Sequence, residues 1–338
     1  MQTDSLMLSN RDKILLRELS TNSRASATYL AKTIGCSIAT VTKLMERLTR
    51  LLDIRFTLEI DMDKLGLSER HILAVKFKKI PSMDFLEGVF NKDVHSQDVY
   101  LTKGDFDVLM FVVADTPINY IAWETNMAAN ISEYSPSVRP SEFVFPQLGF
   151  IPLSETFTGF IREEFRLDTK DKLILKILNS NSRVGYRELS RASGINEDTV
   201  RYRVFKLVHR GIIRRFTIAV QQPSSGTLIA YFMRYSFNKT TTTRAFPMMR
   251  KHYMREDEGV PLINRFPIIA PISGSYRSFG MVFGRDKKDA FYNGITWHKN
   301  VLKNEDVVES HATVIKPIKG ILPLRNLDAT SNYRYIWR

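Results

Sequence analysis

The sequence LDTKDKLILKILNSNSRVGYRELSRASGINEDTVRYRVFKLVHRGIIRRFTIAV occupies residues 167–220 and sets the organisation of the chain. Its first segment repeats apolar residues at helical spacing, which predicts a helix with one apolar face: Leu173, Ile174, Ile177 and Leu178. A second, short helix is expected over residues 187–193. Gly194 then allows a tight turn, because glycine adopts positive φ without steric cost, and Asn196 can cap the helix that follows.

A third helix is expected from Glu197, with apolar and polar side chains on opposite sides. Its apolar side is predicted to hold Val200, Val204, Leu207 and Val208, and its polar side Thr199, Arg201, Tyr202, Lys206 and Arg210. Gly211 ends this helix, and the pattern of residues 212–217 is typical of a two-stranded β-ribbon. Three short helices followed by such a wing make a winged helix-turn-helix, a motif that places its third helix in the major groove of DNA.

Residues 8–60 repeat this pattern at an almost constant offset. Asp12, Asn22-Ser23-Arg24, Leu30, Gly35 and Thr40-Val41 recur 159 positions later, as Asp171, Asn181-Ser182-Arg183, Leu189, Gly194 and Thr199-Val200. Arg55-Phe56-Thr57 recurs as Arg215-Phe216-Thr217, one residue further on. A repeat of this length is a unit of architecture, so the sequence predicts two winged helix-turn-helix domains.

The net charge of +13 is distributed unevenly along the 338 residues. Residues 8–60 contribute +4 and residues 167–222 contribute +7, whereas residues 66–150 contribute −4. Basic helix-turn-helix segments favour a nucleic-acid partner. Residues 223–338 contribute a further +9, which the helix-turn-helix segments leave unexplained and which could serve flanking DNA, RNA or an acidic protein.

Composition also limits where the chain is expected to work. Cys36 is the single cysteine, so no intrachain disulfide can form. It lies in the first turn, where a small buried hydrophobe is favoured over a redox switch. No apolar run approaches the roughly 20 residues that span a bilayer, and the N-terminus lacks a secretory signal pattern. These features favour a cytoplasmic protein with no membrane partner.

Each helix-turn-helix segment is followed by strands and helices in the order β-α-β-β-α-β, which is typical of a ferredoxin-like domain. The predicted fold class is therefore α+β, with two winged helix-turn-helix domains, each followed by a ferredoxin-like domain, arranged as a pseudo-dimer. The predicted boundaries are residues 8–60 and 68–146 for the first pair, 147–166 for a linker, 167–222 and 226–320 for the second pair, and 321–338 for a tail.

Both repeats resemble the Lrp/AsnC family of prokaryotic transcription regulators. The resemblance rests on Leu-x-x-x-Asp, the Asn-Ser-Arg triplet, the glycine turn, the Thr-Val start of the third helix and Arg-Phe-Thr, and on the turn Gly104-Asp105-Phe106-Asp107 of the first ferredoxin-like domain. It implies a chain built like a dimer of such regulators, fused so that dimerisation no longer depends on concentration. It also implies double-stranded DNA as partner, an amino-acid or other small-molecule effector, and further homo-oligomerisation.

The residues expected to contact DNA lie on the third helix of each repeat and beside it. Arginine can bond guanine edges, and both Lys and Arg neutralise phosphate. In the second repeat Arg203 could instead be a structural ion-pair partner, and in the first repeat Leu44 replaces that arginine, so the first repeat could be a weaker clamp or a partner surface. The full set is Ser37, Thr40, Thr42, Lys43, Arg47, Arg50, Asn196, Thr199, Arg201, Tyr202, Arg203, Lys206, Arg210 and Arg214.

The resemblance implies an effector site near Gly104, Asp105, Asp107 and Ser275, where carboxylates could hold an ammonium group. The alternative is a β-turn that simply uses Gly and Asp, and it is favoured for Asp107. If the ferredoxin-like domains pack face to face and hold the third helices about one DNA turn apart, roughly 34–36 Å, both helices reach successive major grooves. Because the repeats differ, the preferred DNA site is expected to be asymmetric.

Enzyme signatures are missing from the sequence. The six histidines have no metal-ligand spacing, and there is no Gly-rich phosphate loop, so no catalytic residue, metal or cofactor is expected. The rival hypothesis is a tetrapyrrole enzyme, because siroheme decarboxylases resemble paired Lrp/AsnC proteins; its candidates are His252, Arg265 and Arg277. A third hypothesis keeps the fold and makes the target the ribosome or RNA polymerase.

Overall fold

A computed structural model describes the chain over residues 9–61, 63–67, 69–138, 142–144, 167–220, 226–235, 268–273, 276, 278–284, 286–290 and 307–319. The linker, the tail and much of the second ferredoxin-like domain lie outside these ranges. So do Ser275, His252, Arg265 and Arg277. Within the described ranges no helix is both long enough and apolar enough to serve as a membrane span.

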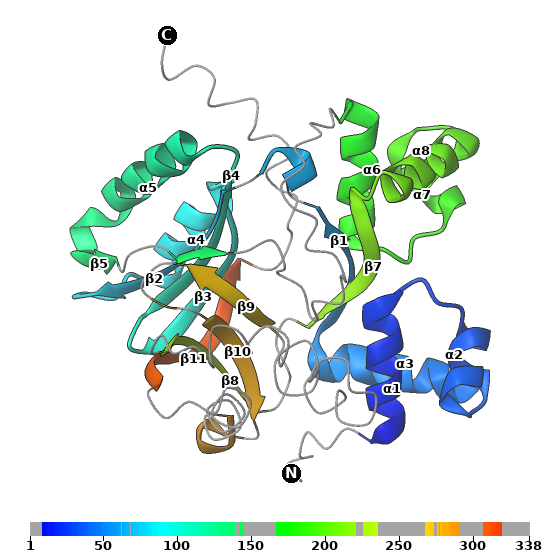
Figure 1. The fold of residues 1–338 in the computed structure, drawn as a ribbon, viewed down its shortest axis with the longest axis horizontal. Coiled ribbons are helices and arrows are strands. Elements are labelled where there is room, and N and C mark those ends of the chain that lie inside the picture. Colours follow the sequence, from blue (N-terminus) through cyan, green and yellow to red (C-terminus); the bar gives the residue numbers. More distant parts are fainter. Residues whose placement is uncertain are drawn as a thin grey trace.

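The chain forms two helical heads, which Figure 1 shows beside a large sheet. Head 1 consists of α1 (Asn10–Thr21), α2 (Ala27–Ile34) and α3 (Ile38–Leu52). Head 2 consists of α6 (Thr169–Ser180), α7 (Tyr186–Ser193) and α8 (Glu197–His209). The helices of the two heads begin 159 residues apart, the offset of the sequence repeat.

Local signals in the sequence account for where these helices begin and end. Ser9 and Asp12 form a capping box at α1, and Asp168 and Asp171 form the equivalent one at α6, so that free backbone N–H groups at both helix starts are bonded. Gly35 and Gly194 end α2 and α7 with φ of 70° and 67°. A side chain is strained in this left-handed region, so glycine permits the tight turn before each third helix.

The sequence predicted a two-stranded wing within each head, and this prediction is wrong. Each head contributes one strand, β1 (Ile54–Ile60) or β7 (Ile213–Val220), and these two strands pair with each other in antiparallel register. Thr57 lies opposite Thr217 near the middle of this ribbon. Since the partner strand lies about 160 residues away, no local pattern in either head could indicate the pairing.

The ribbon also exchanges apolar side chains between the heads. Leu58 and Ile60 of β1 are buried in the core of head 2, among residues of α6 and α8. Ile218 of β7 is buried with the core residues of head 1. Each head therefore completes its core with the other head's strand, and neither core is whole without both segments.

The strands expected for the two ferredoxin-like domains form one nine-stranded sheet. From the first domain come β2 (Glu69–Phe77), β3 (Ser96–Gly104), β4 (Val108–Ala114), β5 (Pro136–Val138) and β6 (Glu142–Val144). From the second come β8 (Thr227–Tyr235), β9 (Ile268–Ser273), β10 (Ser278–Gly284) and β11 (Val307–Lys319). Both β5 and β6 pair with β2 in antiparallel register.

The sheet closes on itself, which corrects the expected face-to-face packing of two separate sheets. The two halves join edge to edge, through β3–β11 and β6–β9, and β2–β4 and β2–β6 complete the ring. The inside of the ring is filled by aromatic side chains, with the rings of Phe106 and Phe232 5.7 Å apart and those of Phe111 and Phe279 5.4 Å apart. Residues from both halves thus share one core.

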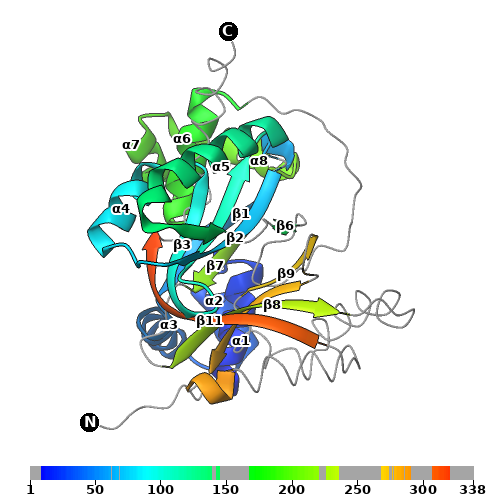
Figure 2. The same ribbon diagram turned by 90° about the vertical axis from the view of Figure 1, so that its left-hand side faces the viewer.

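The outer face of the first half is covered by α4 (Met83–Lys92) and α5 (Pro117–Ile131), which lie in front of the strands in Figure 2. Alternate strand residues point to this outer core, among them Leu73, Val75 and Val99, which pack with Leu86 and Trp123 of the helices. The helix–strand order of the first half therefore follows the prediction.

Candidate nucleic-acid interface

A polar joint holds the two heads together at the Asn-Ser-Arg triplets. The hydroxyl groups of Ser23 and Ser182 lie 2.6 Å apart in a buried hydrogen bond. Arg24 Nη2 donates to the carbonyl oxygen of Val184, and Arg183 Nη1 donates to that of Ser23, so each arginine reaches into the opposite head. The repeat of these triplets and their family resemblance did not indicate this role in joining the heads.

The ribbon residues Phe56 and Phe216 complete the joint. The backbone N–H of Ser23 donates to the carbonyl of Phe216 at 2.8 Å, and that of Ser182 donates to the carbonyl of Phe56 at 2.9 Å. Arg183 stacks over the Phe56 ring at 5.4 Å, and Arg24 over the Phe216 ring at 4.9 Å. The joint therefore uses the same residue types on both sides and holds the two heads together.

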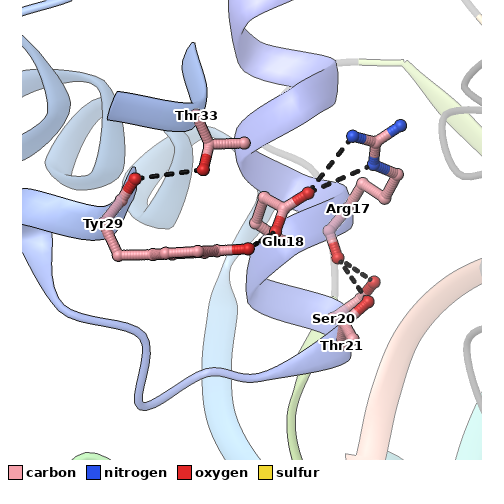
Figure 3. A network of polar contacts seen from close by, with 6 residues as sticks. All are labelled: Arg17, Glu18, Ser20, Thr21, Tyr29 and Thr33. Carbon is pink, nitrogen blue, oxygen red and sulfur yellow. Dashed lines mark hydrogen bonds and ion pairs between the residues drawn. The ribbon is translucent and has the colours of Figure 1, made fainter. Parts of the chain in front are cut away.

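A second network fixes α2 within head 1 (Figure 3). Tyr29 of α2 donates its hydroxyl to Glu18 of α1 at 3.1 Å, and Glu18 also accepts from Arg17 at 3.2 Å. Tyr29 in turn accepts from Thr33 through its carbonyl oxygen at 3.0 Å. These contacts explain an aromatic side chain that is otherwise 53% exposed, and they anchor the helix that precedes α3.

On α3, polar side chains crowd the N-terminal half. Ser37 caps the helix by accepting from the N–H of Thr40 at 3.1 Å, and the Thr42 hydroxyl donates to a carbonyl within the helix. Lys43 and Arg50 are exposed, and neither makes an ion pair or hydrogen bond among the described residues. Their charges are available to a ligand outside the chain.

Arg47 of α3 has a second task. Its guanidinium donates to the buried carboxylate of Asp12 in the α1 capping box. Burial would raise the pKa of Asp12, but hydrogen bonds from Arg47 and Ser9 lower it below its usual value. Since the Arg47 side chain remains 47% exposed, its outer part still lies on the surface of head 1.

In head 2 the corresponding anchor is Arg203, for which a structural ion-pair role was the alternative to DNA contact. Its Nη1 donates to Asp168 at 2.7 Å and to Asp171 at 2.8 Å, and only 20% of its side chain is exposed. Burial alone would raise the pKa of Asp168, but hydrogen bonds from the Asp171 backbone and from Arg203 lower it. In head 1 the position equivalent to Arg203 is Leu44. Arg47, about one helical turn further along α3, makes the corresponding ion pair with Asp12.

Arg214, also expected to contact DNA, makes an ion pair within the chain. It lies on β7 and donates to Asp61 at 2.9 Å, with 25% of its side chain exposed. The contact ties head 2 to the end of β1, so this arginine stabilises the ribbon.

The other predicted residues of head 2 lie on or beside α8. Asn196 caps the helix by accepting from the N–H of Asp198 at 2.9 Å, as the sequence predicts. Arg201 is 55% exposed and pairs with Glu197 at 2.6 Å, a surface pair of small net stability that DNA can displace. Thr199, Tyr202, Lys206 and Arg210 lie along the same helix and its end.

The outward face of α8 differs from the prediction. Val208, expected in the core, is 41% exposed, and Phe205 is 65% exposed beside an equally exposed Tyr202. Phe205 stacks on His209 with ring centroids 5.6 Å apart. The repeat offset could have found this feature, because Phe205 stands where head 1 has Glu46.

The Gly104–Asp107 turn is occupied by contacts within the ring of strands. Asp107 is buried and accepts from the backbone of Phe77 at 2.9 Å and from Lys76 at 2.7 Å. Asp105 accepts from the backbone of His311 on β11 at 2.9 Å. Gly104 packs so closely on β11 that a Cβ would lie 2.7 Å from the His311 carbonyl oxygen. The turn therefore joins the two halves of the sheet.

Among the described residues, no group of three or more His, Cys, Asp or Glu side chains could hold a metal ion. Cys36 is partly buried against the core of head 1.

Sequence comparison relates the chain to helix-turn-helix regulators. Residues 167–214 match the family model for winged helix-turn-helix DNA-binding domains. An uncharacterized HTH-type transcriptional regulator of Pyrococcus abyssi is 27% identical over 124 residues, 37% of this chain and 72% of that protein. The HTH-type transcriptional regulator Ptr1 of Methanocaldococcus jannaschii is 45% identical over 60 residues, 18% of this chain and 40% of that protein.

Structure comparison matches the whole architecture to a different protein. The crystal structure of the siroheme decarboxylase NirDL superimposes with a TM-score of 0.54, covering 95% of this chain and 99% of that one. The two sequences are 12% identical, so this likeness concerns the fold alone.

Proposed function

We propose that this chain, whose helix-turn-helix is related to those of Lrp-like transcription regulators, regulates transcription by binding double-stranded DNA with both heads. The observation that carries the proposal is the joint between the heads. It holds α3 and α8 in a fixed relation while Lys43, Arg50 and Arg201 remain exposed on them. A rigid pair of third helices suits two neighbouring turns of one duplex.

Residues 8–146 and 167–320 are proposed to act as the two halves of a single-chain pseudo-dimer. The exchange of ribbon strands and the closed sheet support this reading, because both make the halves interdependent. In such a chain the halves cannot dissociate on dilution. A single molecule therefore supplies both heads for DNA binding, whatever the protein concentration. Further self-association is a property of Lrp-like regulators that remains a proposal for this chain.

Amino-acid binding at the Gly104–Asp107 turn has less support. Both carboxylates already accept hydrogen bonds, and the glycine lies against β11. We assign this turn the role of coupling the two halves. An effector would act by shifting the contact between β3 and β11, since that contact joins the part of the sheet that follows head 1 to the part that follows head 2.

A second candidate function, a tetrapyrrole enzyme, is favoured by one observation. The fold match extends over 95% of the chain, and the matched siroheme decarboxylase has also been solved in complex with an iron-uroporphyrin III analogue. The enzyme hypothesis predicts that the purified chain binds an iron uroporphyrin, with a shift of its Soret band. The regulator hypothesis predicts no such shift.

The test of the proposed function is selection from a random duplex pool by the full chain, followed by fluorescence anisotropy with the selected duplex. The proposal expects enrichment of one sequence and binding that weakens with salt. Enrichment should fail for a Lys43→Ala/Arg50→Ala variant but persist for Lys78→Ala, which removes an exposed charge from the loop after β2. Binding that does not discriminate between selected and unselected duplexes contradicts the proposal.

A further inference from the structure

The outermost faces of the two third helices carry different chemistry. With 3.6 residues per turn, residues 198, 202, 205 and 209 lie opposite the buried Val200, Val204 and Leu207 of α8, and all four are exposed. They are Asp198, Tyr202, Phe205 and His209. The equivalent positions on α3, 159 residues earlier, are Ala39, Lys43, Glu46 and Arg50, which are also exposed. Tyr202 and His209 of head 2 thus stand where head 1 has the cations Lys43 and Arg50. Phe205 stands where head 1 has Glu46.

The flanks of α8 remain basic. Arg201 lies on one side of the aromatic face, and Lys206 and Arg210 lie on the other. A helix seated in the major groove points its outermost side chains at base edges and its flanking side chains at the phosphate backbones. The basic flanks of α8 would therefore face the two phosphate backbones that border the groove. The aromatic side chains between them would face an apolar group on a base edge.

The apolar group on a base edge in the major groove is the thymine methyl. We infer that head 2 recognises the thymine methyl group through Phe205, whereas head 1 recognises guanine through Lys43 and Arg50. Lys and Arg pair with guanine O6 and N7, and apolar side chains pack on the thymine methyl. This inference rests on the proposed function and adds to it which base each head reads.

The geometry supports Phe205 as the central contact. Its ring is 65% exposed and is held in place by stacking on His209, so it is presented on the helix without being part of the core. Covering such a side chain with a methyl-bearing base edge removes apolar area from water on both partners. Three of the large hydrophobic side chains exposed among the described residues lie on α8: Tyr202, Phe205 and Val208.

The test uses the full chain and a duplex selected from a random pool, in which thymine is replaced by deoxyuridine in one half-site at a time. Deoxyuridine keeps the base pair and lacks the 5-methyl group. We expect about fourfold weaker binding for each contacted methyl, the value for one buried carbon, in one half-site only. The other half-site should be insensitive to this exchange.

Phe205→Ala should bind the thymine and deoxyuridine duplexes equally. Glu46→Ala, at the equivalent position of head 1, should still discriminate between them. Both side chains are exposed, so neither substitution removes a buried core residue, and unchanged melting temperatures verify this. Discrimination that survives in Phe205→Ala, or selective binding that ignores deoxyuridine in both half-sites, overturns the inference and leaves the proposed function intact. An absence of any selective duplex binding contradicts both.

Discussion

Ser23 and Ser182 share a buried hydrogen bond of 2.6 Å although 159 residues separate them. They occupy the same place in the two repeats, so the bond lies where equivalent backbones of the two heads meet. Arg24 and Arg183 extend this contact by crossing to the opposite head. The relation between α3 and α8 is therefore set by residues that lie outside both third helices.

This joint predicts non-additive stability changes. Ser23→Ala and Ser182→Ala should each lower the free energy of unfolding by about 1–2 kcal/mol, because each leaves the other hydroxyl buried without its partner. The double variant should cost less than the sum of the two, because both partners are then absent. Denaturant unfolding of the four proteins measures the coupling. Ser180→Ala, which removes an exposed hydroxyl of α6, is the control and should change stability little. Strict additivity contradicts the joint.

Arg203 and Arg201 are predicted to have opposite roles despite lying on one helix. Arg203→Ala should destabilise the protein by roughly 1–3 kcal/mol, because it leaves the buried Asp171 without its charged donor. Arg201→Ala should leave the melting temperature nearly unchanged and weaken DNA binding. Thermal unfolding and anisotropy at a temperature where both variants are folded separate the two effects. A stable Arg203→Ala variant with lost DNA affinity would return Arg203 to the DNA-contacting set.

Gly104→Ala should weaken the junction between the two halves of the sheet. The residue has φ of 155°, and an added Cβ would lie 2.7 Å from the His311 carbonyl oxygen and 2.8 Å from the Ala312 Cα. We expect a loss of at least about 1–3 kcal/mol, measured by thermal unfolding. Gly88→Ala in α4 is the matched control, since no atom lies within 4 Å of its added Cβ and alanine favours helix. Equal effects of the two substitutions would contradict the close contact with β11.

Asp93 predicts a pH dependence of stability. Burial would raise its pKa, but hydrogen bonds from His95 and Ser96 lower it from 3.8 to about 2. A carboxylate with a lowered pKa contributes stability above its unfolded pKa and loses it as the pH falls through the folded one. Stability should therefore decrease between about pH 4 and pH 2, by roughly 2 kcal/mol from this group. Asp93→Asn should be less stable at pH 7 and show a shallower decline in acid. An unchanged decline would assign the loss to other carboxylates.

Much of each head could be predicted from local sequence. Apolar spacing located the helices, and Gly194 and Asn196 have the turn and cap roles that their chemistry indicated. The order of strands and helices in residues 69–144 also followed the pattern of alternating side chains.

The contacts between distant segments could not be predicted in this way. A strand pattern at residues 212–217 does not reveal its partner, so β7 was expected to pair locally and instead pairs with β1. The same limit applies to the site. Composition cannot distinguish Arg203 from Arg201. Arg203 is held by two aspartates at the start of α6, whereas Arg201 remains exposed, and this difference depends on how α6 packs against α8.

The most direct measurement of the central claim is binding of the full chain to its selected duplex at several salt concentrations. Our account predicts sequence-selective binding, with a slope of log affinity against log salt between about −3 and −5, since each neutralised phosphate contributes about −0.9. Lys43→Ala/Arg50→Ala should lower the affinity for the selected duplex, and Lys78→Ala should not change it. Affinity that is independent of sequence, or unaffected by Lys43→Ala/Arg50→Ala, would contradict the account.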